Sequence, residues 1–231
     1  MKPRVATIIP AFNEEETIVQ VVATVRQSML VDEVIVVSDG STDRTALLAE
    51  EAGAKVLCLP IQSGKGAALR HGVTFTDAPI LLFLDADLRG LREEHIEALL
   101  TPVLNEARQM NIGLRDRGTF SRWIGPRLPL VSGERALLRR IFEDVPDEHL
   151  QGYMVEASLN FACRSHKWAY GSVFMPGVKI RTKFEKVGWK AFPQYGRMWW
   201  QVLKAFWIVR WAYASGRVED LTSKRKHQKR L

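Results

Sequence analysis

The chain has 231 residues, of which 46% are hydrophobic and 26% are charged, and its formal net charge is +7. This composition excludes a wholly disordered chain, and the length fits one large domain or one domain with an appendage. The basic residues gather at the end, where residues 224–231 hold five of the 33 Lys and Arg. No base-reading motif accompanies this basic tail, so we expect no nucleic-acid partner.

The first half of the chain alternates β-branched runs with segments of helical periodicity. This alternation predicts an α/β fold, in which a mostly parallel sheet is flanked by helices. Residues 80–84 are apolar throughout, as in strands that are covered on both faces. The predicted strands are residues 5–9, 33–37, 55–59 and 80–84, and the predicted helices are residues 14–29, 42–52 and 65–74.

The second half has weaker periodicity. Residues 112–133 are rich in Arg, Gly and Pro, which predicts a long loop. The two cysteines, Cys58 and Cys163, lie far apart in apolar surroundings, so we expect two buried thiols in a reducing compartment. Helices are predicted at residues 94–108, 133–142 and 154–166, and a strand is predicted at residues 173–180.

Residues 194–216 form a Trp-rich segment with two apolar stripes at helical spacing. It also contains the polar and charged residues Gln201, Lys204 and Arg210, which disfavour a membrane-spanning helix. Two readings are equally favoured: a terminal helix packed on the core, and a helix lying in a membrane interface beside the basic tail. Because residues 5–9 read as a strand and not as a signal peptide, we expect a cytoplasmic protein, either free or peripheral on the inner face of the cell membrane.

Asp85, Ala86 and Asp87 directly follow the strand predicted at residues 80–84. Two carboxylates beside an apolar core are costly without a partner. A divalent cation, Mg²⁺ or Mn²⁺, would neutralise them, and a nucleotide diphosphate would complete its oxygen shell. The spacing of two residues at a strand end turns the carboxylates in opposite directions. One can therefore face the cation while the other faces a ribose or a backbone donor.

Three further polar segments lie at predicted strand ends or helix starts. Residues 10–15 and 38–43 suit helix N-termini, and Ser41 or Asp43 would cap the second of these helices. The functional alternative is a nucleotide site, in which Asp39 accepts a hydrogen bond from a base N–H. Lys65 stands between two glycines, where it can approach a diphosphate or a base closely, although the spacing is not that of a P-loop.

Together these segments resemble glycosyltransferase family 2 and its relatives with the GT-A fold. The matching stretches are IIPAFNEEETI, VDEVIVVSDGSTDRT, GKGAALRHG and ILLFLDADL, which follow the family's order over residues 5–90. The later stretches LVSGERALLRR and GYMVEASLN look like the acceptor-side motifs of the same group. Within the family, the chain is most similar to glucosyl-3-phosphoglycerate synthases, and it also resembles polyprenyl-phosphate sugar transferases.

The resemblance implies a donor-side role for each matching residue. Asp39 would bind the base, Lys65 would support the base or the diphosphate, and Asp87 would bind the metal and serve catalysis. The nucleoside would be contacted by the remaining matching residues, Pro10, Ala11, Phe12, Glu14, Asp85 and Ala86.

Acceptor-side roles follow in the same way. Glu134, with Gly133 beside it, and Glu156 fall where acceptor-side acids are expected. Glu156 is the candidate catalytic base if the reaction inverts configuration, and it positions the acceptor if configuration is retained. Arg115 and Arg117, from the Arg-rich segment, suit a phosphorylated acceptor or the leaving diphosphate, because arginine pairs well with phosphate.

These expectations combine into a metal-dependent hexosyltransferase that uses a UDP-sugar, with a GDP-sugar as the alternative donor. The Trp-rich segment favours a lipid or lipid-phosphate acceptor, and a soluble acceptor such as 3-phosphoglycerate is the runner-up. Synthase-like relatives supply a late histidine as a metal ligand, and residues 177–183 hold none, so the metal would rely on Asp87, phosphates and water. Two other classes stay open, a sugar nucleotidyltransferase and a catalytically idle membrane-binding module.

We expect three regions along the chain. Residues 1–90 would form the nucleotide-sugar-binding half of a GT-A domain, and residues 91–193 would form its acceptor-binding half. Residues 194–231 would hold the Trp-rich amphipathic helix and the basic tail. The partners expected are a nucleotide-sugar donor, a lipid or small phosphorylated acceptor, an anionic membrane surface and, as one form of assembly, a second copy in a homodimer.

Overall fold

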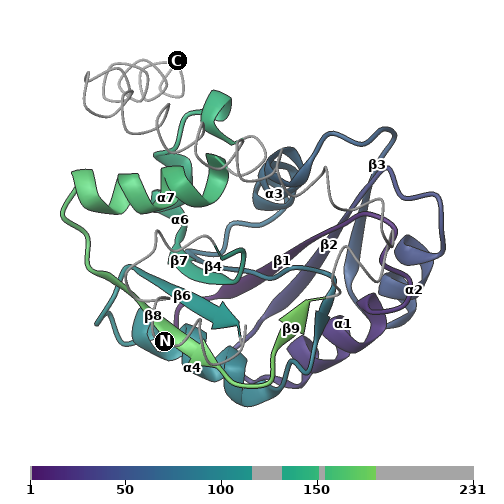
Figure 1. Cartoon of the computed structure of the whole chain (residues 1–231), viewed down its shortest axis with the longest axis horizontal. Helices are drawn as coiled ribbons and strands as arrows, with labels where there is room; N and C mark the ends of the chain where they lie inside the picture. Colours follow the sequence, from purple (N-terminus) through teal and green to yellow (C-terminus); the bar gives the residue numbers. More distant parts are fainter. Residues whose placement is uncertain (1, 116–131, 151–153, 181–231) are drawn as a thin grey trace, which may run out of the picture.

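The computed structural model describes residues 2–115, 132–150 and 154–180. A seven-stranded sheet lies between two layers of helices (Figure 1). A separate antiparallel pair joins β5 (Leu88–Arg89) to β9 (Lys179–Ile180). In sheet order, the seven strands are β3 (Lys55–Leu59), β2 (Glu33–Asp39), β1 (Val5–Ala11), β4 (Ile80–Phe83), β7 (Arg135–Leu138), β6 (Met110–Arg115) and β8 (Tyr170–Met175).

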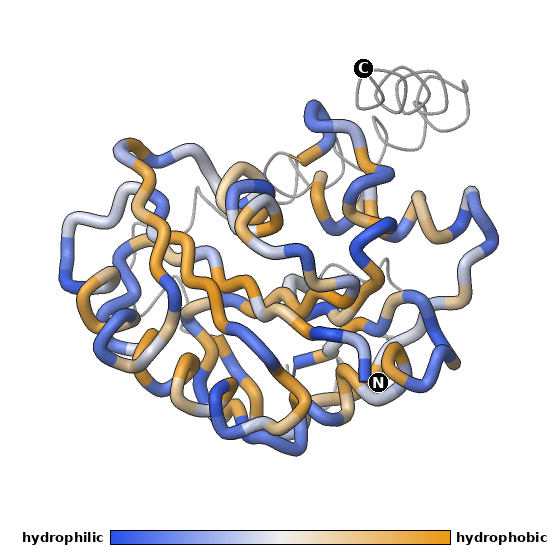
Figure 2. Tube along the Cα trace, turned by 180° about the vertical axis from the view of Figure 1, so that it is seen from behind, coloured by the Kyte–Doolittle hydropathy of each residue, from blue (hydrophilic) through white to orange (hydrophobic). Residues whose placement is uncertain are grey.

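Each face of the sheet has its own apolar core beneath a layer of helices. In Figure 2 the strands are mostly hydrophobic, and hydrophilic residues lie mainly in the loops and on the outer sides of the helices. A short turn of 3-10 helix, η1 (Asp147–His149), lies between α6 and α7 in the chain. One face carries α1 (Ile18–Gln27), α2 (Thr45–Glu51) and α4 (Glu93–Leu104), and the other carries α3 (Lys65–Thr74), α6 (Arg139–Glu143) and α7 (Met154–Ser165).

The β1 strand shows why the inner strands are apolar along their whole length. Successive side chains of a strand point to opposite faces of the sheet. Val5 and Ile9 therefore enter the core under α1 and α4, whereas Ala6 and Ile8 enter the core under α3. All four side chains are fully buried, so a polar residue at any of these positions would face a dry core.

The strand order places a switch point between β1 and β4. Strand β1 pairs in parallel with β2 on one side and with β4 on the other. Ligands of such sheets bind outside the carboxyl ends of the strands at this point. Strand β7 runs antiparallel to both β4 and β6, so its start lies at the same edge as their carboxyl ends. The edge therefore gathers side chains that follow β4, end β6 and precede β7.

The predicted α/β fold is confirmed, and two elements match their predicted bounds, β3 and α3. The first two helices begin later than predicted, at Ile18 and Thr45, because the preceding residues form loops that bond to each other. The Trp-rich segment and the basic tail lie outside the described residues. Within the described ranges, no helix is both long and apolar enough to cross a membrane.

Several local predictions for the second half were wrong. The helix predicted at residues 133–142 is strand β7 followed by the short helix α6, because Ala136 and Leu137 alternate between the two cores. The loop predicted from residue 112 begins as strand β6, and the strand predicted at residues 173–180 is split between β8 and β9. Cys163 is buried as expected, whereas Cys58 is exposed because β3 is an edge strand with a partner on one side only.

The start of α3 makes a close contact that gives a first testable prediction. A Cβ atom on Gly66 would lie 1.8 Å from the backbone oxygen of Leu150, which cannot move without its chain. We expect Gly66→Ala to lower the free energy of unfolding by about 1 to 3 kcal/mol, as overpacking does. Helix propensity alone would raise the free energy of unfolding by about 1 kcal/mol. The sign of the change in a urea titration therefore shows whether the clash with Leu150 or the helix propensity dominates. Ala67→Gly in the same turn calibrates the propensity effect.

Candidate active site

The loops after β1 and β2 interlock at the carboxyl edge of the sheet. The backbone N–H of Thr42 donates to Asn13 Oδ1 at 2.8 Å, and the N–H of Glu14 donates to Thr45 Oγ1 at 2.8 Å. Asn13 adopts a left-handed conformation, with φ 54°, that turns the chain out of β1. These bonds fix the chain directly after Phe12, which is 38% exposed. The predicted nucleoside loop is therefore held in place by hydrogen bonds and exposes the aromatic ring of Phe12.

The other predicted nucleotide residues lie along the same edge. Pro10 and Ala11 end β1, where they pair with Val37 and Ser38 of β2. Ala86 is buried between the two aspartates that follow β4, so its backbone, and not its small side chain, is what it can offer a ligand.

Asp39 ends β2 and holds the turn that leads into α3. Its Oδ1 accepts from the N–H of Ser63 and its Oδ2 accepts from the N–H of Gly64, each at 2.7 Å. Gly64 has φ 90°, which a residue with a side chain rarely adopts, and Lys65 follows it as the first residue of α3. Asp39 therefore fixes the position of Lys65, a role that its motif alone did not reveal.

Five charged side chains form a linear cluster across the switch point. Lys65 Nζ lies 2.6 Å from Asp85 Oδ1 and 3.2 Å from Glu156 Oε1. Arg115 Nη1 lies 3.5 Å from Asp85 Oδ2 and 3.4 Å from Glu134 Oε1. Asp85 thus binds one cation through each oxygen, and each cation reaches a second carboxylate. We call Lys65, Asp85, Arg115, Glu134 and Glu156 the charge cluster.

Burial makes the charge cluster electrostatically strong. Glu134 is fully buried and its Oε2 accepts a hydrogen bond from Ser132 Oγ at 2.5 Å. Burial and the neighbouring Asp85 carboxylate raise the pKa of Glu134. Burial alone would lower the pKa of Lys65, but the carboxylates of Asp85 and Glu156 outweigh it and raise that pKa. Lys65 is therefore a permanent cation at neutral pH.

Gly133 leaves the space in which the Lys65–Asp85 pair forms. A Cβ atom at this position would lie 2.3 Å from Lys65 Nζ and 2.6 Å from Asp85 Oδ1. Any other residue here would push the two charged groups from their places. The sequence had indicated Gly133 only as a neighbour of Glu134, and its steric role appears only in the fold.

Asp87 lies two residues beyond Asp85, is partly buried, and acts electrostatically on Arg115. Together with the charge cluster it makes four carboxylates, which face the cations Lys65 and Arg115 and, through Glu134 and Glu156, the buried Arg135. Carboxylate oxygens such as those of Asp87 suit Mg²⁺ or Mn²⁺. Residues 2–115, 132–150 and 154–180 hold no group of three or more His, Cys, Asp or Glu that could hold a metal ion. With the described residues alone, a cation at Asp87 would need further oxygen atoms from a bound ligand or water.

Arg135 supports the acceptor side and was missed by the sequence analysis. Its buried guanidinium donates from Nε to the backbone carbonyl oxygen of Ser132 at 2.7 Å and from Nη1 to Asn160 Oδ1 at 2.8 Å. These bonds tie the start of β7 to α7, the helix that carries Glu156. The signal was the Arg of the SGER stretch, which looked like part of a helix. Arg117 lies outside the described residues.

Glu134 gives a prediction about stability and pH. A carboxyl whose pKa is raised on folding binds its proton more tightly in the folded state, so its favourable contribution is present at low pH and lost as pH rises through the folded pKa. Glu134→Gln keeps the neutral form at every pH. We expect it to raise the free energy of unfolding at pH 8 by on the order of 1 kcal/mol and to change it little at pH 4. Urea titrations at both pH values test this, with the exposed Glu97→Gln as control.

Comparison with known proteins decides the family. A family profile described as "Glycosyl transferase family 2" matches residues 6–160. The chain belongs to glycosyltransferase family 2. The matched part runs from β1 to α7 and contains every member of the charge cluster.

Curated relatives in the family include two kinds of enzyme. A glucosyl-3-phosphoglycerate synthase of Mycolicibacterium smegmatis is 40% identical over 109 residues, which are 43% of this chain and 36% of the relative. A 4,4'-diaponeurosporenoate glycosyltransferase of Staphylococcus haemolyticus is 36% identical over 116 residues, 48% of this chain and 30% of the relative. The chain thus aligns with about a third of the length of these curated relatives.

A solved structure extends the likeness over most of the chain. It is glucosyl-3-phosphoglycerate synthase from Mycobacterium tuberculosis in complex with Mn²⁺, uridine-diphosphate-glucose and phosphoglyceric acid. The TM-score is 0.74 at 26% identity, and the match covers 90% of this chain and 79% of that chain. The GT-A fold expected for this glycosyltransferase family is therefore confirmed.

Proposed function

We propose that this family 2 member transfers a hexose from a UDP-sugar to an anionic acceptor, with a divalent cation bound at Asp87. The observation that carries the proposal is the charge cluster at the switch point, directly beside Asp87. Donor-side residues from α3 and the segment after β4 contact acceptor-side residues from β6 and α7 there. The solved synthase complex, which holds Mn²⁺ and UDP-glucose, supports this choice of donor and metal.

The donor would lie on the two loops that follow β1 and β2. Pro10, Ala11, Phe12 and Glu14 would line the nucleoside, with Asp39 at the base. Lys65 starts α3, and the positive end of a helix favours the diphosphate. A cation at Asp87, when bound, would offset the charge that develops on the leaving diphosphate. Asp85, which contacts both Lys65 and Arg115, would orient these two cations toward the leaving diphosphate.

The transfer breaks the bond between the anomeric carbon and the diphosphate oxygen and forms a bond to an acceptor oxygen. The acceptor also loses a proton. If configuration is inverted, Glu156 takes this proton as the catalytic base. If configuration is retained, an oxygen of the leaving phosphate takes it, and Glu156 positions the acceptor. Glu156 Oε2 is buried and makes no hydrogen bond with the described residues, so it has capacity for an acceptor hydroxyl.

The acceptor would meet Arg115, the last residue of β6, and Glu134, which directly precedes β7. Both kinds of curated relative are named for anionic acceptors, a phosphoglycerate and a carboxylate of apolar character. A buried arginine beside the site suits such an anion. We place a soluble phosphorylated acceptor first on this ground. A lipid acceptor, favoured by the Trp-rich segment, is the second candidate, and the corresponding location is the inner membrane face.

A transfer assay on the full chain tests the proposal. UDP-glucose or GDP-glucose is incubated with Mn²⁺ and either 3-phosphoglycerate or a short polyprenyl phosphate, and release of the nucleoside diphosphate is followed. We expect UDP release that depends on an acceptor and stops with EDTA. Release with the polyprenyl phosphate alone would select the lipid candidate. Failure of both nucleotide sugars to bind would refute the proposed donor site.

The remaining expectations become part of the proposal. We assign the donor to residues 1–90, the acceptor to residues 91–193, and a membrane contact to residues 194–231. Flotation of the full chain with anionic vesicles at low salt tests the last assignment, because a basic surface contact weakens as salt rises. Equilibrium sedimentation tests the homodimer.

A further inference from the structure

Lys65 is shared between two carboxylates that belong to different steps of the proposed reaction. Its ammonium lies 2.6 Å from Asp85, on the donor side, and 3.2 Å from Glu156, on the acceptor side. The two partners come from different elements, the segment after β4 and the first turn of α7. Through these two contacts, Lys65 joins the donor side to Glu156.

The contacts of Lys65 are unequal. The bond to Asp85 is short, and the hydrogen bond to Glu156 is longer. Gly133 supplies the space that the ammonium occupies, since a Cβ there would lie 2.3 Å from Lys65 Nζ. A diphosphate at the start of α3 would carry more negative charge than Glu156 and would compete for the same ammonium. The longer contact is the one that such competition breaks first.

We propose that Lys65 couples donor binding to the release of Glu156: without donor it neutralises Glu156, and the donor diphosphate draws it away. The inference rests on the proposed function and deepens it. Glu156 would then gain its free carboxylate for the acceptor hydroxyl only after the donor is bound. A second consequence follows for affinity, because Glu156 competes with the diphosphate and so opposes donor binding.

A double-mutant cycle on nucleotide affinity measures this competition without any turnover. UDP binding in the presence of Mg²⁺ is measured by calorimetry for the wild-type chain, Glu156→Gln, Lys65→Met and the double variant. We expect Glu156→Gln to tighten UDP binding about five-fold, as the release of one partly buried ion pair would. Lys65→Met should weaken UDP binding about ten-fold. In the Lys65→Met background, Glu156→Gln should have no effect.

Each outcome of the cycle bears on the inference. Unchanged or weaker UDP binding by Glu156→Gln overturns it. A tightening that persists in the Lys65→Met background also overturns it, because the cause is then general repulsion between Glu156 and the nucleotide. Glu97→Gln is the matched control, because it removes an exposed charge from α4, on the opposite face of the sheet from α3. It should leave the affinity for UDP unchanged. Absence of UDP binding in every variant, wild type included, would refute the proposed donor instead.

Discussion

Asp87→Ala is expected to abolish metal-dependent nucleotide binding and to lower the rate of transfer by about 10³-fold or more. The reason is that Asp87 is the proposed protein ligand of the cation, and the described residues offer no group of three or more acidic, His or Cys side chains to replace it. Loss of one preorganised electrostatic contact to a leaving group costs about 10²- to 10³-fold in rate, and loss of the cation removes several such contacts. Calorimetry of UDP with Mn²⁺ and with EDTA measures the binding part.

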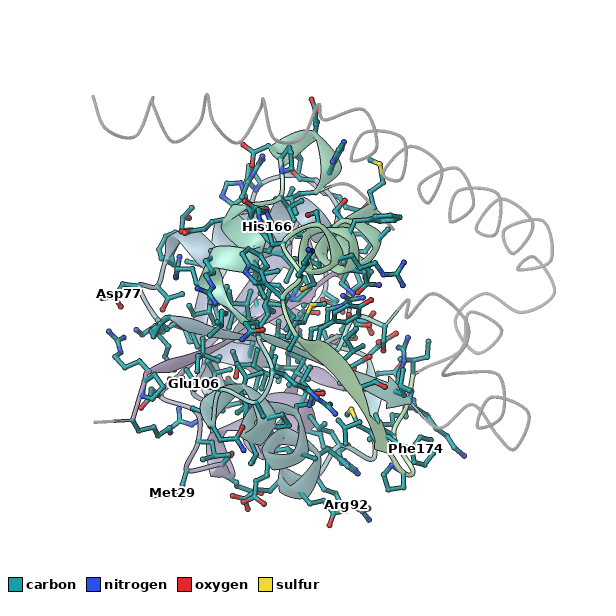
Figure 3. All side chains as sticks on the ribbon, turned by 90° about the vertical axis from the view of Figure 1, so that its left-hand side faces the viewer. Met29, Asp77, Arg92, Glu106, His166 and Phe174 are labelled. Atoms are coloured by element: carbon teal, nitrogen blue, oxygen red, sulfur yellow. The ribbon has the colours of Figure 1, made fainter. Side chains whose placement is uncertain are left out.

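The matched control for this prediction is Asp77→Ala. Asp77 pairs with Arg4 at 2.6 Å, but its side chain is 83% exposed and it lies at the periphery of the molecule (Figure 3). Exposed pairs contribute little, so this variant should bind UDP and Mn²⁺ as the wild type does. If Asp87→Ala bound UDP with unchanged affinity and unchanged response to EDTA, the cation would have to be placed elsewhere.

Gly133→Ala is expected to lower the transfer rate by about 10²-fold while changing the stability of the fold little. The added Cβ would lie 2.3 Å from Lys65 Nζ, so the ammonium must leave its place between Asp85 and Glu156. A misplacement of about 1 Å in a catalytic arrangement can cost about 10²-fold. The groups that move are the far ends of flexible side chains, which limits the cost in unfolding free energy. Steady-state rates together with urea titrations test both parts.

Comparison with Gly66→Ala separates a site effect from a folding effect. That variant places its Cβ against a backbone carbonyl and should lose stability, whereas Gly133→Ala should lose activity at near wild-type stability. A Gly133→Ala variant with full activity would show that Lys65 and Asp85 need not be paired in the working enzyme. Equal losses of stability in the two variants would show that Gly133 is required for folding.

The donor-side half of the fold follows from local sequence pattern. Strand β3 and helix α3 have their predicted bounds, and every predicted nucleotide residue lies at the carboxyl edge of the sheet. This succeeds because strand and helix periodicity are local properties, and because parallel strands place their carboxyl ends at one edge. The second half was predicted less well, since β7 and β6 are strands only by virtue of their neighbours in the sheet.

The sequence by itself determined the fold class, the family and the residue types from which the site is built. Only the tertiary structure decided which of those residues meet. Lys65 and Glu156 are 91 positions apart, and no periodicity relates them, yet their side chains lie 3.2 Å apart. Gly133 was visible as a glycine, but the space that it leaves for Lys65 and Asp85 exists only once β7 runs antiparallel beside β4. Contacts of this kind depend on strand order and helix packing, which distant segments of the chain set together.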